Sequence, residues 1–147
     1  MYQKILVATD GSELSKKAAN TAIDLAALAG SELVALKVIP RYPQSYFEGS
    51  LALQAEEISR VEKQWADDGQ AVVNAVQKAA QARGVKTQAI IVKSDLVSDA
   101  IITAASQHKC DLIVMASHGR KGMKRLLLGS ETQHVLTHAA IPVLVLR

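Results

Sequence analysis

Two polar segments of the chain carry residue types that can hold an anion. ATDGS (8–12) places an aspartate before Gly-Ser, and ASHGRKG (116–122) places two glycines among basic side chains. Glycine lets backbone N–H groups approach an anion because no Cβ stands in the way. Gly129 and Ser130 then open a helical pattern, whose N-terminus offers unpaired N–H groups to a phosphate. On these residues alone, a phosphate site and a plain tight turn with a serine cap are equal alternatives.

Asp10 can play more than one part at the end of its apolar run. It can hold a cation, accept a hydrogen bond from a base or ribose, or cap the next helix. Motifs for other chemistries are missing from the sequence: G-x-G-x-x-G, G-x-x-x-x-G-K-[ST] and G-x-S-x-G do not occur. His134 and His138 have helical spacing but lack the H-E-x-x-H pattern, which disfavours a metal site. The chain therefore offers places for phosphate and no clear general base.

Five apolar runs rich in β-branched residues must position these segments. Their continuous apolarity is typical of strands that are covered on both faces of a parallel sheet. The runs cover residues 4–9, 32–39, 86–92, 111–116 and 142–146. Helical patterns separate them, and right-handed crossovers would place those helices on both faces of the sheet. The order predicts an α/β fold of one domain, residues 1–147.

Capping residues mark the ends of the predicted helices. Ser12 can begin the first helix and Gly30 can end it. The second helix is expected at about 51–82, the third from Ser98 and Asp99, and the fourth from Gly129-Ser130 to a point before Pro142. In the first helix, the apolar stripe is predicted to comprise Leu14, Ala18, Ala22, Leu25 and Ala29.

The place where ligands bind can also be predicted from this order of elements. In open parallel sheets, ligands bind beyond the carboxyl ends of the strands, where the strand order reverses. Residues 8–12 follow the first strand and residues 116–122 follow the fourth. Both polar segments are therefore expected at one binding site.

Composition excludes several classes of protein. The 147 residues are 49% hydrophobic and 21% charged, which is the balance of a folded domain. A net charge of +3, with one dense cationic stretch at 120–125, makes long nucleic acid an unlikely ligand. That stretch is either a solvated face or a means of screening phosphates. No apolar run approaches the length of a membrane span.

The beginning of the chain and its single cysteine bear on where the protein acts. Met1 to Lys4 lead straight into the first strand, and no hydrophobic signal segment is seen. Cys110 is expected to be a buried small hydrophobe rather than a reactive thiol. We therefore expect a cytoplasmic protein.

One segment, 40–50, fits either a lid or partner surface, or an irregular loop with its aromatic side chains against the core.

The assembled residues resemble the universal stress protein family over essentially the whole chain. The resemblance is carried by KILVATDGSELSKKA, CDLIVMASHGRKGMKRLLLGS and IPVLVLR. The nucleotide motif of that family is G-x2-G-x9-G-[ST]. Gly119, nine residues and Gly129-Ser130 reproduce its second part, whereas Ala116 stands at the position of the first glycine.

This resemblance implies a Rossmann-like, adenine-nucleotide α-hydrolase-like sandwich of three layers, with a five-stranded parallel sheet and helices on both faces. It also implies ATP as ligand, with Mg²⁺ that Asp10 could orient. By the same resemblance, Ala8, Thr9, Asp10 and Val38 would surround adenine and ribose, Met115, Ala116 and Gly119 would line the ribose and phosphate side, and Gly129, Ser130, Glu131 and Thr132 would supply N–H or hydroxyl donors to the phosphates. Glu131 is expected to point outward, because an inward carboxylate would repel a phosphate.

The function implied is that of a nucleotide-dependent regulator in the stress response, with at most slow ATP hydrolysis. Relatives of this kind commonly form homodimers through the last strand, here residues 142–146. The alternative is a dimeric protein-interaction module of the same fold that binds no nucleotide, and Ala116 is the residue that favours it. A true phosphotransferase or hydrolase is the least favoured reading.

Overall fold

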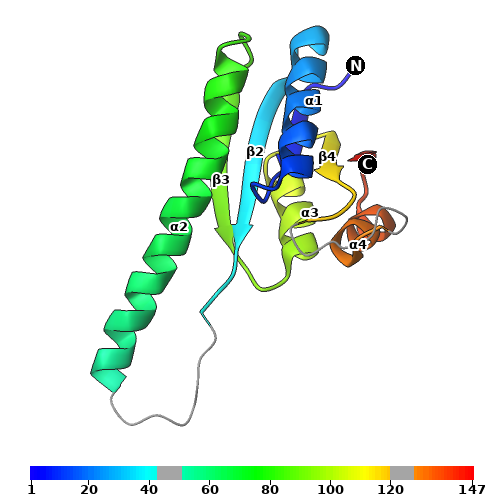
Figure 1. The fold of residues 1–147 in the computed structure, drawn as a ribbon. Helices are drawn as coiled ribbons and strands as arrows, with labels where there is room; N and C mark the ends of the chain where they lie inside the picture. Colours follow the sequence, from blue (N-terminus) through cyan, green and yellow to red (C-terminus); the bar gives the residue numbers. More distant parts are fainter. Residues whose placement is uncertain (43–50, 120–127) are drawn as a thin grey trace.

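The structure, a computed structural model, describes residues 1–42, 51–119 and 128–147, with residues 51–54 described by their backbone alone. Strands and helices alternate along the chain (Figure 1). In order they are β1 (Lys4–Ala8), α1 (Glu13–Ala29), β2 (Glu32–Ile39), α2 (Leu51–Gln81), β3 (Thr87–Lys93), α3 (Val97–Gln107), β4 (Leu112–Ala116), α4 (Ser130–His138) and β5 (Val143–Leu146).

All five strands form one parallel sheet in the order β3-β2-β1-β4-β5. The chain runs outward from β1 to β3, returns through α3 to β4 on the other side of β1, and ends at β5. The strand order therefore reverses between β1 and β4, which is where a ligand site is expected. The predicted fold class is confirmed, and each predicted strand lies within one residue of the observed bounds. The third helix begins at Val97, one residue earlier than predicted.

The two ends of α1 are capped as the sequence predicts. The Ser12 hydroxyl accepts the N–H of Ser15, and Gly30 ends the helix with a φ of 70°, in the left-handed region that favours glycine. The predicted apolar stripe is partly wrong, since Leu14, Leu25 and Ala29 are only partly buried. The buried face comprises Ser15, Ala18, Ala19, Ala22, Ile23 and Ala26. Small residues lie on this face because α1 crosses directly over β1 and β4.

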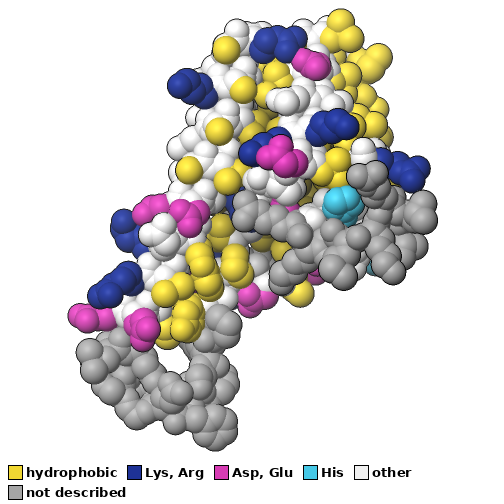
Figure 2. Space-filling view, in the orientation of Figure 1, with side chains coloured by type: hydrophobic (Ala, Val, Ile, Leu, Met, Phe, Trp, Pro, Cys, Tyr) yellow, Lys and Arg dark blue, Asp and Glu magenta, His cyan; other side chains and the backbone are white. Residues whose placement is uncertain are grey.

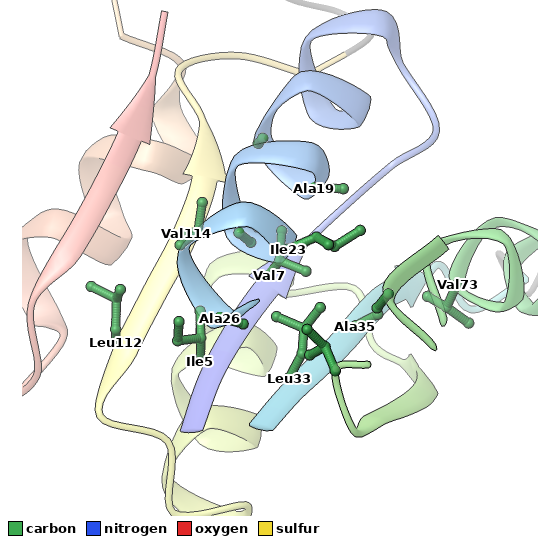
Figure 3. Close-up of a cluster of buried hydrophobic side chains, with 14 residues drawn as sticks. Ile5, Val7, Ala19, Ile23, Ala26, Leu33, Ala35, Val73, Leu112 and Val114 are labelled. Carbon is green, nitrogen blue, oxygen red and sulfur yellow. The ribbon is translucent and has the colours of Figure 1, made fainter. Parts of the chain in front are cut away.

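Each face of the sheet has its own apolar core. Under α1 and α2, the side chains of β1, β2 and β4 meet the alanines of α1 and Val73 of α2 (Figure 3). On the opposite face, α3 and α4 cover a second cluster, which includes Leu6, Leu36, Ile101, Ile113 and Val135. Residues along β1 and β4 alternate between the two clusters, as expected for strands that are buried on both faces.

Asp111 fixes the beginning of β4 against the beginning of β1. Its carboxylate accepts the backbone N–H of Gln3 at 2.8 Å and of Lys4 at 3.1 Å, and its own N–H donates to the Lys4 carbonyl. Burial raises the pKa of Asp111, but these backbone hydrogen bonds outweigh it, and the pKa lies below its ordinary value. This alignment brings the carboxyl ends of β1 and β4 side by side.

Helix α2 lies close to the sheet because of a glycine in its middle. A Cβ on Gly69 would lie 2.9 Å from Cγ2 of Ile39 in β2, so a larger residue would push the helix away. Just beyond the same end of β2, the ring of Tyr42 stacks on Trp65 of α2, with 6.0 Å between the centroids. Residues 43–50, for which a lid was one prediction, lie outside the described residues.

Charged side chains on the surface are interspersed by sign. On the face shown in Figure 2, acidic and basic groups alternate along α2 and α1 and do not gather into one basic field. None of the helices in the described part of the chain combines the length and apolarity that crossing a membrane requires.

Candidate functional site

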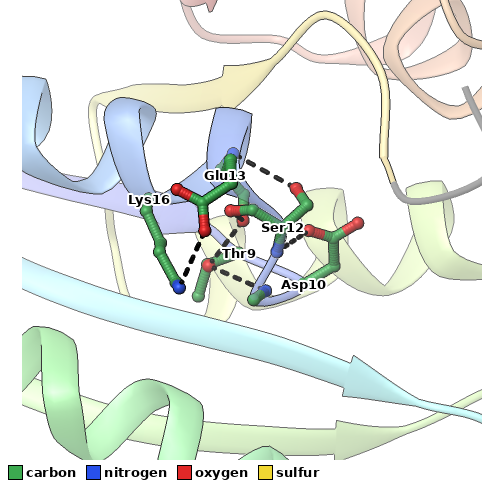
Figure 4. Close-up of polar contacts among 7 residues, drawn as sticks. Thr9, Asp10, Ser12, Glu13 and Lys16 are labelled. Atoms are coloured by element: carbon green, nitrogen blue, oxygen red, sulfur yellow. Dashed lines mark hydrogen bonds and ion pairs between the residues drawn. The ribbon is translucent and has the colours of Figure 1, made fainter.

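The loop after β1 is held by a network of short-range hydrogen bonds (Figure 4). Oδ1 of Asp10 accepts the N–H of Ser12 at 2.9 Å, and Gly11 has a φ of 83°, which a side chain would disfavour. Thr9 is buried, donates its N–H to the Leu36 carbonyl at 2.9 Å and donates its hydroxyl to Ser15 at 3.1 Å. Asp10 thus stabilises the turn between β1 and α1, and it lies just beyond the carboxyl end of β1.

The described part of the loop after β4 approaches this first loop at Gly119. A Cβ built on Gly119 would lie 2.6 Å from Oδ2 of Asp10, a distance that real Cβ atoms do not reach. The φ of Gly119 is not in the left-handed region. Glycine is therefore favoured here by the close approach of the Asp10 carboxylate, which a side chain would displace, and not by backbone conformation.

Two hydrogen bonds tie the start of α4 back to the end of β4. The N–H of Gly129 donates to the Ser117 carbonyl at 2.7 Å, and the hydroxyl of Thr132 donates to the Ala116 carbonyl at 2.9 Å. A Cβ on Gly129 would lie 3.3 Å from the Ser117 oxygen, so this glycine also serves a close approach. The donors of Gly129 and of the Thr132 side chain are thus engaged within the protein.

The other hydrogen-bond donors expected to meet the phosphates include backbone N–H groups at the start of α4. Ser130 and Glu131 are the first two residues of α4, where a helix provides no acceptor of its own for the N–H groups. No side chain among the described residues caps this end of the helix. Ser130 is exposed. The start of α4 therefore presents a positive end with exposed donors beside the β4 loop.

Two of the residues expected around adenine and ribose belong to the apolar cluster on the α3 and α4 face: Val38 is buried in it, and Ala8 packs against it. Met115, expected on the ribose and phosphate side, is buried in the same cluster. Ala116 ends β4, is 8% exposed and pairs with Leu146 in β5. Among the described non-glycine residues only Lys109 has a positive φ, so the methyl group of Ala116 causes no backbone strain.

Glu131 is exposed, and its carboxylate contacts α3. Its Oε2 accepts the backbone N–H of Ser98, in α3, at 2.8 Å. This agrees with the expected outward orientation and also gives the residue a partner that the sequence did not reveal. The basic stretch Arg120, Lys121, Lys124 and Arg125 lies outside the described residues.

An open groove of about 1070 Å³ lies on the α1 side of the two loops. It is lined by Ser12, Glu13, Leu14, Lys16, Lys17, Asn20, Ser117, His118, Gly119 and Arg147. Of the predicted site residues, only Gly119 lines it. The sequence reasoning missed the polar side of α1, although residues 13, 16, 17 and 20 have the spacing of one helix face. It missed Arg147 because only the sheet order brings the end of the chain beside α1.

The two histidines of α4 form no metal centre with their described neighbours. Nε2 of His134 lies 3.0 Å from Oδ1 of Asp99 in α3, and the rings of His134 and His138 stack with centroids 4.1 Å apart. Within the described residues, no group of three or more metal-binding side chains gathers.

Comparison with known proteins agrees with this arrangement. The family model described as the universal stress protein family matches residues 1–147. Universal stress protein MJ0531 of Methanocaldococcus jannaschii is 34% identical, in an alignment covering 100% of this chain and 83% of the relative. The solved structure of MJ0577, a universal stress protein of the same organism, superposes with a TM-score of 0.83 at 29% identity, covering 99% of this chain and 96% of the other.

A universal stress protein solved in complex with cAMP superposes with a TM-score of 0.70 at 26% identity, and the match covers 99% of this chain and 97% of the other. The five-stranded parallel sheet with its helices is thus a fold shared with these proteins. On the full-length match and the identity to these relatives, the chain belongs to the universal stress protein family.

Proposed function

We propose that this protein binds ATP, with Mg²⁺, at the carboxyl ends of β1 and β4 and acts as a nucleotide-dependent regulator in the stress response. The observation that carries the proposal is the contact of the two loops. The Asp10 carboxylate approaches Gly119 so closely that it would have to move to admit a side chain there, and the start of α4 is tied to the same loop. An acid and a positive helix end thus lie at the switch point of the sheet.

The residues at this point suit the parts of a magnesium nucleotide. N–H groups at the start of α4 suit phosphate oxygens, and a carboxylate such as that of Asp10 is the kind of ligand that Mg²⁺ accepts. Ala8, Val38 and Met115 supply an apolar side for a base. When bound, Mg²⁺ would neutralise phosphate charge. The complex of a relative with cAMP supports an adenine nucleotide as the ligand class.

Regulation with at most slow hydrolysis is proposed because Asp10 is already engaged. Its Oδ1 accepts the N–H of Ser12, which restrains the carboxylate as a general base. We also propose a cytoplasmic location, where thiols stay reduced. Burial raises the pKa of the single cysteine, Cys110, to about 11, so its thiol is protonated at neutral pH and unreactive.

We propose a homodimer formed through β5. This strand pairs with β4 along one edge, it ends the strand order of the sheet, and Leu144 on it is 38% exposed. A second copy related by a two-fold axis would cover the edges of both sheets.

Native mass spectrometry of the protein with Mg-ATP tests both parts of the proposal. The expected spectrum shows a dimer that carries two nucleotides, because each chain has a complete pair of loops. Omitting ATP gives the control. A dimer that takes up no nucleotide at millimolar ATP would contradict nucleotide binding, and a monomer with one nucleotide would contradict only the assembly.

Replacing Ala116 by glycine separates this function from the alternative of an interaction module without nucleotide. Because Ala116 lies in β4 without positive φ, restoring the glycine of the family motif relieves no strain. We expect the ATP affinity of Ala116→Gly to stay within about twofold of the wild type, with a loss of roughly 0.5–1 kcal/mol in unfolding free energy. Titration with a fluorescent ATP analogue checks this. A gain of tenfold or more would show that alanine impairs the native site.

A further inference from the structure

Helix α3 lacks a cap from its own sequence, and Glu131 of α4 supplies one. Leu96 stands at the N-cap position and makes no side-chain hydrogen bond there. The N–H of Ser98, the second residue of the helix, has no acceptor within the helix. It donates instead to Oε2 of Glu131 at 2.8 Å. The carboxylate therefore lies against the positive end of α3 as well as in the first turn of α4, and both dipoles favour its charge.

A second contact joins the same two helices one turn farther along α4. Nε2 of His134 lies 3.0 Å from Oδ1 of Asp99, the neighbour of Ser98. Glu131 and His134 are three residues apart, so they lie on one side of α4 and face consecutive residues of α3. Contacts of this kind matter for α4 because the helix has nine residues and only Thr132 and Val135 are buried.

We propose that Glu131 is a positioning residue for nucleotide binding: by capping α3, it holds the first turn of α4 in place for the phosphates. This inference rests on the proposed function. The carboxylate of Glu131 binds the Ser98 N–H of α3, and this role does not require it to touch the nucleotide. It acts through the N–H groups of α4, whose direction is fixed when one end of the helix is tied to β4 and its side is tied to α3.

The two neutral variants Glu131→Ala and Glu131→Gln isolate this role. Both remove the negative charge, and with it any repulsion of the phosphates, but only glutamine keeps an acceptor for the Ser98 N–H. We expect Glu131→Ala to bind ATP about fivefold more weakly than Glu131→Gln, the effect of one lost hydrogen bond. Adenosine, which has no phosphates, should bind both variants with equal affinity. Isothermal titration calorimetry measures all four affinities.

Hydrogen exchange at the Ser98 amide provides a second readout that needs no nucleotide. Exchange should become several-fold faster in Glu131→Ala than in Glu131→Gln, because the acceptor is lost. The positioning role would be overturned if the two variants bound ATP with equal affinity. It would also be overturned if Glu131→Ala bound adenosine more weakly than Glu131→Gln by the same factor as it binds ATP. If the wild-type protein bound no ATP, the proposed function itself would fail, and Ser98 exchange would still decide whether Glu131 caps α3.

Discussion

Replacing Gly119 by alanine should weaken ATP binding about tenfold while the protein stays folded. The new Cβ would lie 2.6 Å from Oδ2 of Asp10, so the carboxylate has to rotate away. Rotation breaks the 2.9 Å hydrogen bond between Oδ1 and the N–H of Ser12 and removes the acid from the end of β1. The loss of that bond should lower the unfolding free energy by about 1 kcal/mol. Titration with ATP and denaturant unfolding measure the two effects.

An Asp10→Ala background provides the control for this prediction. Apart from the chain neighbours of Gly119, the described atoms within 4 Å of the new Cβ belong to Asp10. In that background, Gly119→Ala should therefore cost almost no unfolding free energy, and the double-mutant cycle should show coupling between the two positions. If Gly119→Ala lowered the unfolding free energy as much in the Asp10→Ala background as in the wild type, the carboxylate would not be what the glycine accommodates. Unchanged ATP affinity of Gly119→Ala alone would contradict a role of the displaced carboxylate in binding.

The sheet could be predicted from the sequence because its three central strands, β2, β1 and β4, are largely buried on both faces. Continuous apolar runs, capping residues and glycines mark the elements, and right-handed crossovers leave little choice of topology. The predicted apolar stripe of α1 was partly wrong because burial there depends on side-chain size as well as on polarity. Alanine and leucine both count as apolar in a pattern, but only the small residues fit where α1 crosses β1 and β4.

Details of the site could not be predicted because they depend on contacts between distant segments. Glycine at 119 and 129 was expected to let an anion approach the backbone or to make a tight turn, and the structure shows in addition close approach to Asp10 and to the Ser117 carbonyl. Thr132 was expected as a donor to phosphate, but its hydroxyl donates to the carbonyl of Ala116. The cap that Glu131 places on α3 joins residues 33 positions apart, and no local pattern reveals it.

The buried hydroxyl of Thr132 leads to the second large effect that we expect. Thr132 is 2% exposed, and its Oγ1 donates to the Ala116 carbonyl at 2.9 Å. Valine has nearly the same shape but no donor, so Thr132→Val should lower the unfolding free energy by about 1–3 kcal/mol, the cost of leaving a buried acceptor without this partner. Of the two hydrogen bonds described above between the start of α4 and the end of β4, the one from Gly129 would remain, and ATP affinity should fall at least fivefold.

Thr132→Ser is the matched variant, because it keeps the hydroxyl and removes one methyl group. Its loss of burial should cost roughly 0.8 kcal/mol, with ATP affinity close to that of the wild type. Denaturant unfolding and ATP titration of the pair therefore separate packing from hydrogen bonding. If the serine variant bound ATP as weakly as the valine variant, the methyl group would position α4, and the hydrogen bond to β4 would have no part in holding the phosphate-binding turn.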